Sequence, residues 1–97
     1  MGLYLIQHTH PVERCPRKNL EMVRQLASHV TPATAAKYGV KILADWVDES
    51  EHTVVLVLEA ERAEQAASFA LPFLNAGQIT VRAGQTCDEV ARECLGQ

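Results

Sequence analysis

Residues 53–59, which read TVVLVLE, constrain the fold more than any other stretch of this sequence. No polar residue stands between Val54 and Leu58, and polar residues bound the run, so we predict a β-strand that is apolar on both faces. A strand with one face in water should instead alternate apolar and polar residues. Both faces of the sheet that contains this strand must therefore be covered.

Three further strands and four helical segments are predicted around this run. Apolar patterns indicate strands at 3–9, 40–47 and 78–82 and helices at 16–30, 32–38, 60–71 and 86–95. Thr31 and Thr86 are predicted to cap the helices that follow them, and Gly39 is predicted to end its helix in a left-handed conformation. One face of the strand at 40–47 is predicted to carry Val40, Ile42, Ala44 and Trp46.

The order of these elements predicts an α+β fold. A strand, a helix, two strands, a helix and a strand make the ferredoxin-like βαββαβ arrangement, here with a C-terminal helix at about 86–95. A chain of 97 residues is expected to form one such domain, spanning 1–97. The expected spatial order of the strands is 4-1-3-2. Two helices can cover only one face of this sheet.

A homodimer is the favoured way to cover the other face. Two sheets can pack face to face about 10 Å apart. Covering Val55 and Val57 in this way is worth ~1.5–3 kcal/mol for each side chain, and a two-fold axis doubles the gain. The alternative is a monomer whose tail helix folds back over the sheet.

The close of the βαββαβ unit resembles a known superfamily. Leu71-Pro72-Phe73-Leu74, followed by Ile79-Thr80-Val81, is similar to the LP…I-x-V close of muconolactone-isomerase-like chains in the dimeric α/β-barrel superfamily. This resemblance covers residues 3–82 and implies that two ferredoxin-like sheets pair into one barrel. The superfamily includes isomerases, monooxygenases with or without haem, and metal- or ligand-binding proteins, so the resemblance leaves the activity open.

Three histidines are expected to converge at one end of the sheet. In the predicted strand order, His8 and His10 at the end of the first strand lie beside His52 at the start of the third, and Cys15 lies on the loop leaving the same end. A His-x-His pair on a strand places both imidazoles on one face. Imidazole and thiolate ligands suit zinc, copper or nickel. We therefore predict a metal site formed by His8, His10, Cys15 and His52.

Other interpretations of these residues stay open. The histidines can simply mark where burial stops, one of them can perform acid–base chemistry, and a haem would need only one axial histidine. Tyr4 and Trp46 are predicted either to line a ligand cavity or to belong to the core. The sequence thus favours a small binding protein for a metal or ligand, with an isomerase or monooxygenase acting on an apolar substrate as the alternative.

The three cysteines receive different predictions. Cys15 precedes a predicted helix, whose dipole would favour a thiolate, so it is expected to be the reactive one. Cys87 and Cys94 fall on the apolar stripe of the tail helix and are expected to pack there.

Charge and composition disfavour some classes of partner and indicate the cellular compartment. A net charge of −3 and a pI near 5.7 disfavour nucleic acid as a partner. Three cysteines are too few for a disulfide scaffold, and the N-terminal residues have neither a secretory signal nor a membrane-spanning run. We expect a cytoplasmic protein that does not bind membranes.

Overall fold

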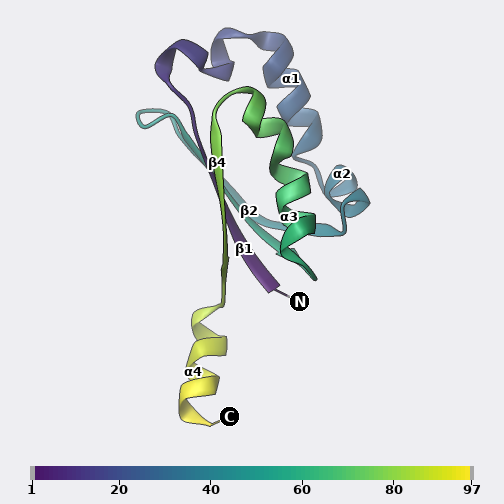
Figure 1. Cartoon of the computed structure of the whole chain (residues 1–97), viewed down its shortest axis with the longest axis vertical. Coiled ribbons are helices and arrows are strands. Elements are labelled where there is room, and N and C mark those ends of the chain that lie inside the picture. The colour runs from purple at the N-terminus through teal and green to yellow at the C-terminus, as the bar shows by residue number, and fades with distance from the viewer. Residues whose placement is uncertain (1, 97) are drawn as a thin grey trace.

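The computed structural model describes residues 2–96, which form a four-stranded antiparallel sheet with helices against one face (Figure 1). The strands are β1 (Gly2–Thr9), β2 (Val40–Asp48), β3 (Thr53–Ala60) and β4 (Gln78–Gly84). The α-helices are α1 (Leu20–His29), α2 (Pro32–Lys37), α3 (Ala63–Ala70) and α4 (Cys87–Leu95), and short 3-10 helices are η1 (Val12–Arg14), η2 (Pro16–Lys18) and η3 (Leu71–Asn75). The predicted α+β, ferredoxin-like order is confirmed.

The sheet order β2-β3-β1-β4 also agrees with the prediction. β1 pairs with β3 in a register that sets His8 opposite Val54 and Thr9 opposite Thr53. Beyond the end of β1, the backbone N–H of His10 donates to the carbonyl of His52 at 3.2 Å. The end of β1 therefore lies directly beside the turn that precedes β3.

The core lies between the sheet and the helices. Ile6, Leu56 and Leu58 point from the two central strands toward Phe69 of α3, and each is at most 2% exposed. Phe69 forms a cluster with two other rings: His29 stacks on it with the centroids 4.5 Å apart, and Tyr38 meets it edge-on at 5.6 Å. The packing of α3 on β1 and β3 thus anchors the fold.

Helix α1 begins later than predicted. Pro16 starts only the short η2, and Asn19 caps α1 by accepting a hydrogen bond from the N–H of Met22 at 3.2 Å. An asparagine side chain is a strong helix cap, whereas a cysteine is a poor one. Cys15 therefore precedes a three-residue turn, and the prediction that the dipole of a long helix acts on it is wrong. The predicted caps at Thr31 and Thr86 are confirmed.

A β-bulge in β2 reverses one predicted face. The register shifts between Ile42 and Ala44, so Val40 and Ile42 face the helices while Ala44 and Trp46 face the opposite side. The extra residue of a bulge inverts the alternation beyond it. The prediction that all four share one face is wrong. Tyr4 lies in the core at 9% exposure and Trp46 is 54% exposed on the other face, so they do not line a common cavity within one chain.

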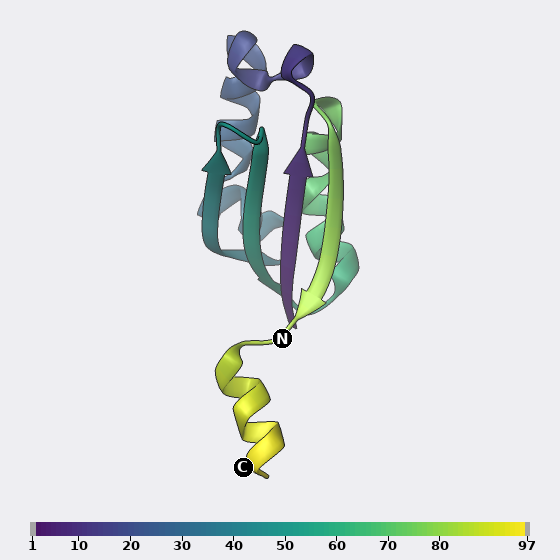
Figure 2. The same cartoon turned by 90° about the vertical axis from the view of Figure 1, so that its left-hand side faces the viewer.

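The opposite face of the sheet is not covered by any helix of the described residues (Figure 2). We call it the open face. Its apolar side chains are Leu3, Leu5, Ala44, Trp46, Val55 and Val57, and polar residues of β1 and β4 continue it. The expectation that something covers this face stays a prediction.

Helix α4 does not provide that cover. It extends beyond the end of the sheet, and each of its residues is exposed (Figure 1). The alternative in which the tail helix folds back over the sheet is therefore wrong for this chain. Cys87 and Cys94 are exposed, against the prediction that they pack. Among residues 2–96, no helix is long and apolar enough to cross a membrane.

Candidate metal centre

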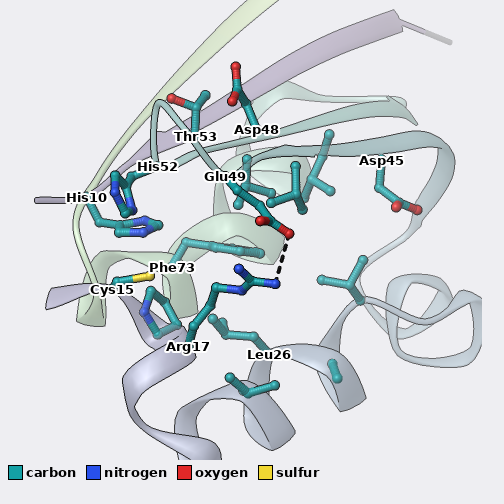
Figure 3. A pocket seen from close by; sticks show the side chains of 17 residues that line it. His10, Cys15, Arg17, Leu26, Asp45, Asp48, Glu49, His52, Thr53 and Phe73 are labelled. Atoms are coloured by element: carbon teal, nitrogen blue, oxygen red, sulfur yellow. Dashed lines mark ion pairs between the residues drawn. The ribbon is translucent and has the colours of Figure 1, made fainter. Parts of the chain in front are cut away.

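Three of the four predicted ligands meet at one end of the sheet. His10 follows the last residue of β1, Cys15 lies between η1 and η2, and His52 lies in the turn between β2 and β3. One ligand atom from each residue lies within 4.8 Å of the other two (Figure 3). We call this group the His/Cys/His cluster. It joins segments that are separate in the sequence and adjacent only in the fold.

Local hydrogen bonds hold Cys15 in this position. Its backbone N–H donates to the carbonyl of Val12 at 3.2 Å, which closes η1. The Arg14 guanidinium donates to the carbonyl of Asn75 at 2.9 Å and so ties the loop to η3. Cys15 is consequently only 8% exposed. The loop presents its thiol to the two imidazoles instead of to solvent.

The turn before β3 positions His52. A carboxylate oxygen of Asp48 accepts hydrogen bonds from the backbone N–H groups of Ser50 and Glu51 and from the Ser50 hydroxyl. These bonds, the Ser50 hydroxyl foremost, lower the pKa of Asp48. His52 itself has a φ of 50°, in the left-handed region that residues other than glycine rarely adopt. The turn holds it there, with its ring centroid 5.2 Å from that of His10.

The fourth predicted ligand, His8, lies next to the cluster but outside it. Its ring centroid is 5.1 Å from that of His10 and 5.2 Å from that of Phe73, and the residue is 1% exposed. Burial, and then the neighbouring His10, lowers the pKa of His8 from 6.5 to about 4. His8 is therefore neutral at pH 7.

The environment of His10 favours the neutral imidazole, which is the form that binds metals. Burial, and then the nearby His52, lowers the pKa of His10 below its ordinary value. Within residues 2–96, none of the ring nitrogens of His8 and His10 has a hydrogen-bond partner. A buried polar atom without a partner costs ~1–3 kcal/mol. A metal ion bound by His10 would satisfy one of these atoms.

The donor set and its spacing fit a four-coordinate ion. Bonds of about 2.0–2.3 Å in a tetrahedral zinc site place neighbouring ligand atoms roughly 3.3–3.8 Å apart. The three donor atoms lie within 4.8 Å of one another, so small side-chain rotations would close the site. Three protein ligands would leave one position open for another ligand.

A cleft of about 450 Å³ opens beside the cluster, between α1 and the β2–β3 side of the sheet (Figure 3). The cluster forms one end, and an ion pair between Arg17 and Glu49, 2.8 Å apart, lies along its edge. Most of the wall is apolar and consists of Val23, Leu26, Ala27 and Val30 from α1 with Val47, Val54, Leu56 and Phe73. Sequence reasoning missed this cleft. The only signal was an apolar stripe on α1, which is equally typical of a closely packed helix.

Gly77 controls how closely β4 approaches the cluster. A Cβ atom at this position would overlap the carbonyl oxygen of Thr9 and lie 2.9 Å from Cα of His10. We expect Gly77→Ala to push the start of β4 away from His10 and to lower the free energy of unfolding by about 1–3 kcal/mol in urea denaturation. Gly84→Ala is the matched control, because a Cβ there meets no described atom within 4 Å. Equal stability of the two variants would contradict this role of Gly77.

The fold and this centre define a small α+β protein with a His/Cys/His group that can hold a metal ion. The chain belongs to the family described as a domain of unknown function, DUF3303, which its sequence matches over residues 3–94. No curated protein matches the chain. The family membership covers nearly the whole chain, and the resemblance to the dimeric α/β-barrel superfamily stays a prediction.

Proposed function

We propose that this protein is a small homodimeric binding protein that holds a transition metal ion through His10, Cys15 and His52. The observation that carries the proposal is the convergence of these three donors, from three separate segments, within 4.8 Å. The lowered pKa of His10 supports it further, because only a neutral imidazole binds a metal. Zinc, copper and nickel are the ions that suit imidazole and thiolate ligands.

The proposed partner is a second copy of this chain, packed on the open face. The apolar side chains of this face include Leu5 and Val57, which pair across the two central strands. The described part of the chain leaves the face without a helix, and α4 extends away from it (Figure 2). A two-fold axis would bring the same residues of both copies into contact.

Metal binding is tested on protein purified without an affinity tag and dialysed against zinc, copper or nickel. We expect roughly one ion per chain by elemental analysis. Cys15→Ser and His52→Ala are each expected to weaken binding by at least about a hundredfold, because loss of a direct ligand costs at least as much as loss of a residue that only orients one. Cys94→Ser is the control for Cys15, since it removes an exposed thiol far from the cluster. Glu51→Ala, at the exposed position next to His52 in the same turn, is the control for His52.

Two results would contradict the proposal. The first is a wild-type protein that takes up none of the three metals. The second is equal uptake by Cys15→Ser and Cys94→Ser, which would show that Cys15 is not a ligand of the ion.

A further inference from the structure

The cleft beside the cluster has the size and lining of a small-molecule site. Its volume of about 450 Å³ lies within the range of about 300–1,000 Å³ that is typical of ligand pockets. The cleft exists because α1 makes its main contacts with η2 and α2 and not with the strands. Leu26 and Val30 of α1 are partly buried against the core. Together with Val23 and Ala27 they also line the cleft, opposite apolar residues of the sheet.

The chemistry of the cleft differs between its two ends. Figure 3 shows His10, Cys15 and His52 gathered at one end and Asp45 at the other. Between the ends the wall is largely apolar. A molecule that fills the cleft would therefore place an apolar body along α1 and present one polar group to the cluster.

The net charge of the metal site indicates which polar group a ligand in the cleft should carry. Two neutral imidazoles, one thiolate and a divalent ion carry a net charge of +1, and the ion keeps one open position. Cys15 is buried and the two histidines are half-buried, so the site is partly shielded from water, and an uncompensated charge there is unfavourable. A donor with a single negative charge would fill the open position and make the site neutral.

We propose that the cleft binds a small carboxylic acid with an apolar body, for which a medium-chain fatty acid is the probe. Its carboxylate would take the open position on the metal, and its apolar body would lie between α1 and the sheet. This inference rests on the proposed metal site.

The acidic residues that line the cleft do not oppose such a ligand. Arg17 pairs with Glu49. The Asp48 carboxylate is held by the turn that it caps. Asp45 is exposed and lies at the end away from the cluster, where solvent screens its charge (Figure 3).

Octanoate added to the cobalt-loaded protein tests the inference. Cobalt(II) replaces zinc in such sites and its visible absorption bands respond to a change of ligand, so we expect octanoate to shift these bands in a saturable way. Octanoate should bind about tenfold more tightly than hexanoate, because two fewer methylene groups are buried in the shorter acid. Octanol, which has no carboxylate, should leave the bands unchanged.

A variant that fills the cleft separates the ligand site from the metal site. Ala27 lines the cleft, so Ala27→Phe should weaken octanoate binding at least about tenfold and leave the cobalt bands of the ligand-free protein intact. Ala33→Phe, at an exposed position of α2 outside the cleft, is the matched control and should bind octanoate normally. Circular dichroism verifies that both variants fold.

The outcomes distinguish the two proposals. Cobalt uptake with bands that octanoate does not change would overturn the carboxylate site and leave the metal site standing. Equal octanoate affinity in Ala27→Phe and Ala33→Phe would do the same. A protein that takes up none of cobalt, zinc, copper and nickel would overturn the proposed metal site, and this inference with it.

Discussion

Replacing Val57 with lysine is expected to convert a dimer of this chain into monomers. Val57 lies in the middle of the open face, opposite Leu5 of β1 and Ala44 of β2. A two-fold axis brings the substitution into the interface twice. Val57 is already half-buried in one chain, so the further burial that two valine side chains lose is worth about 1–2 kcal/mol, or roughly a fivefold to thirtyfold change in the dissociation constant. The cost of removing two lysine charges from water adds to this.

Sedimentation velocity at micromolar concentrations measures the change. Leu20→Lys is the matched control, because Leu20 is an apolar residue that is 67% exposed at the start of α1, on the helix side of the sheet. Val57→Thr keeps the shape of the side chain and should weaken the dimer less than lysine does. Circular dichroism separates dissociation from unfolding. A wild-type protein that sediments as a monomer at high micromolar concentration would rule out the dimer.

Acid is expected to destabilise the metal-free protein by about 3 kcal/mol between pH 7 and pH 4, through His8. The pKa of His8 is about 4 in the folded chain and 6.5 in an unfolded chain. Between these two values the unfolded chain binds the proton and the folded chain does not, so protonation favours unfolding as the pH falls. The stability associated with neutral His8 is therefore complete above pH 6.5 and is progressively lost toward pH 4.

Urea denaturation of His8→Leu at both pH values isolates this effect. Leucine has no titratable group, so the variant should lose about 3 kcal/mol less than the wild type on acidification. Ile6→Val, on the same face of β1, is the control. It should lower the free energy of unfolding by about 0.5–1.5 kcal/mol at both pH values. A chelator is present throughout so that metal ligation by His10 does not contribute. The same pH dependence in His8→Leu and the wild type would contradict the assignment.

Much of the candidate centre could be predicted from the sequence. The βαββαβ order fixes which strands are neighbours, and the end of β1 must then lie beside the start of β3. His10 and His52 meet for this reason, joined by the hydrogen bond between their backbones. The role of His8 could not be separated from that of His10, because a spacing of two residues places both on the same side of the strand. Only tertiary packing buries His8 against Phe73 and places His10 in the His/Cys/His cluster.

The features that the sequence did not predict involve distant parts of the chain. The bulge in β2 moves Trp46 to the open face, and it depends on pairing with β3. The cleft depends on the distance between α1 and the sheet, and the apolar periodicity of α1 does not predict that distance. The position of α4 away from the sheet also depends on packing between distant parts of the chain and not on the pattern within the helix.

The amino-acid sequence by itself determined most of the elements, their order, their caps at Thr31 and Thr86, and the apolar character of both faces of β3. These properties follow from side-chain periodicity and from hydrogen bonds between residues a few positions apart. Only the tertiary structure decided the bulge, the cleft, the burial of His8 and the open face. Each of these depends on how surfaces far apart in the sequence pack against one another, and local patterns do not encode that packing.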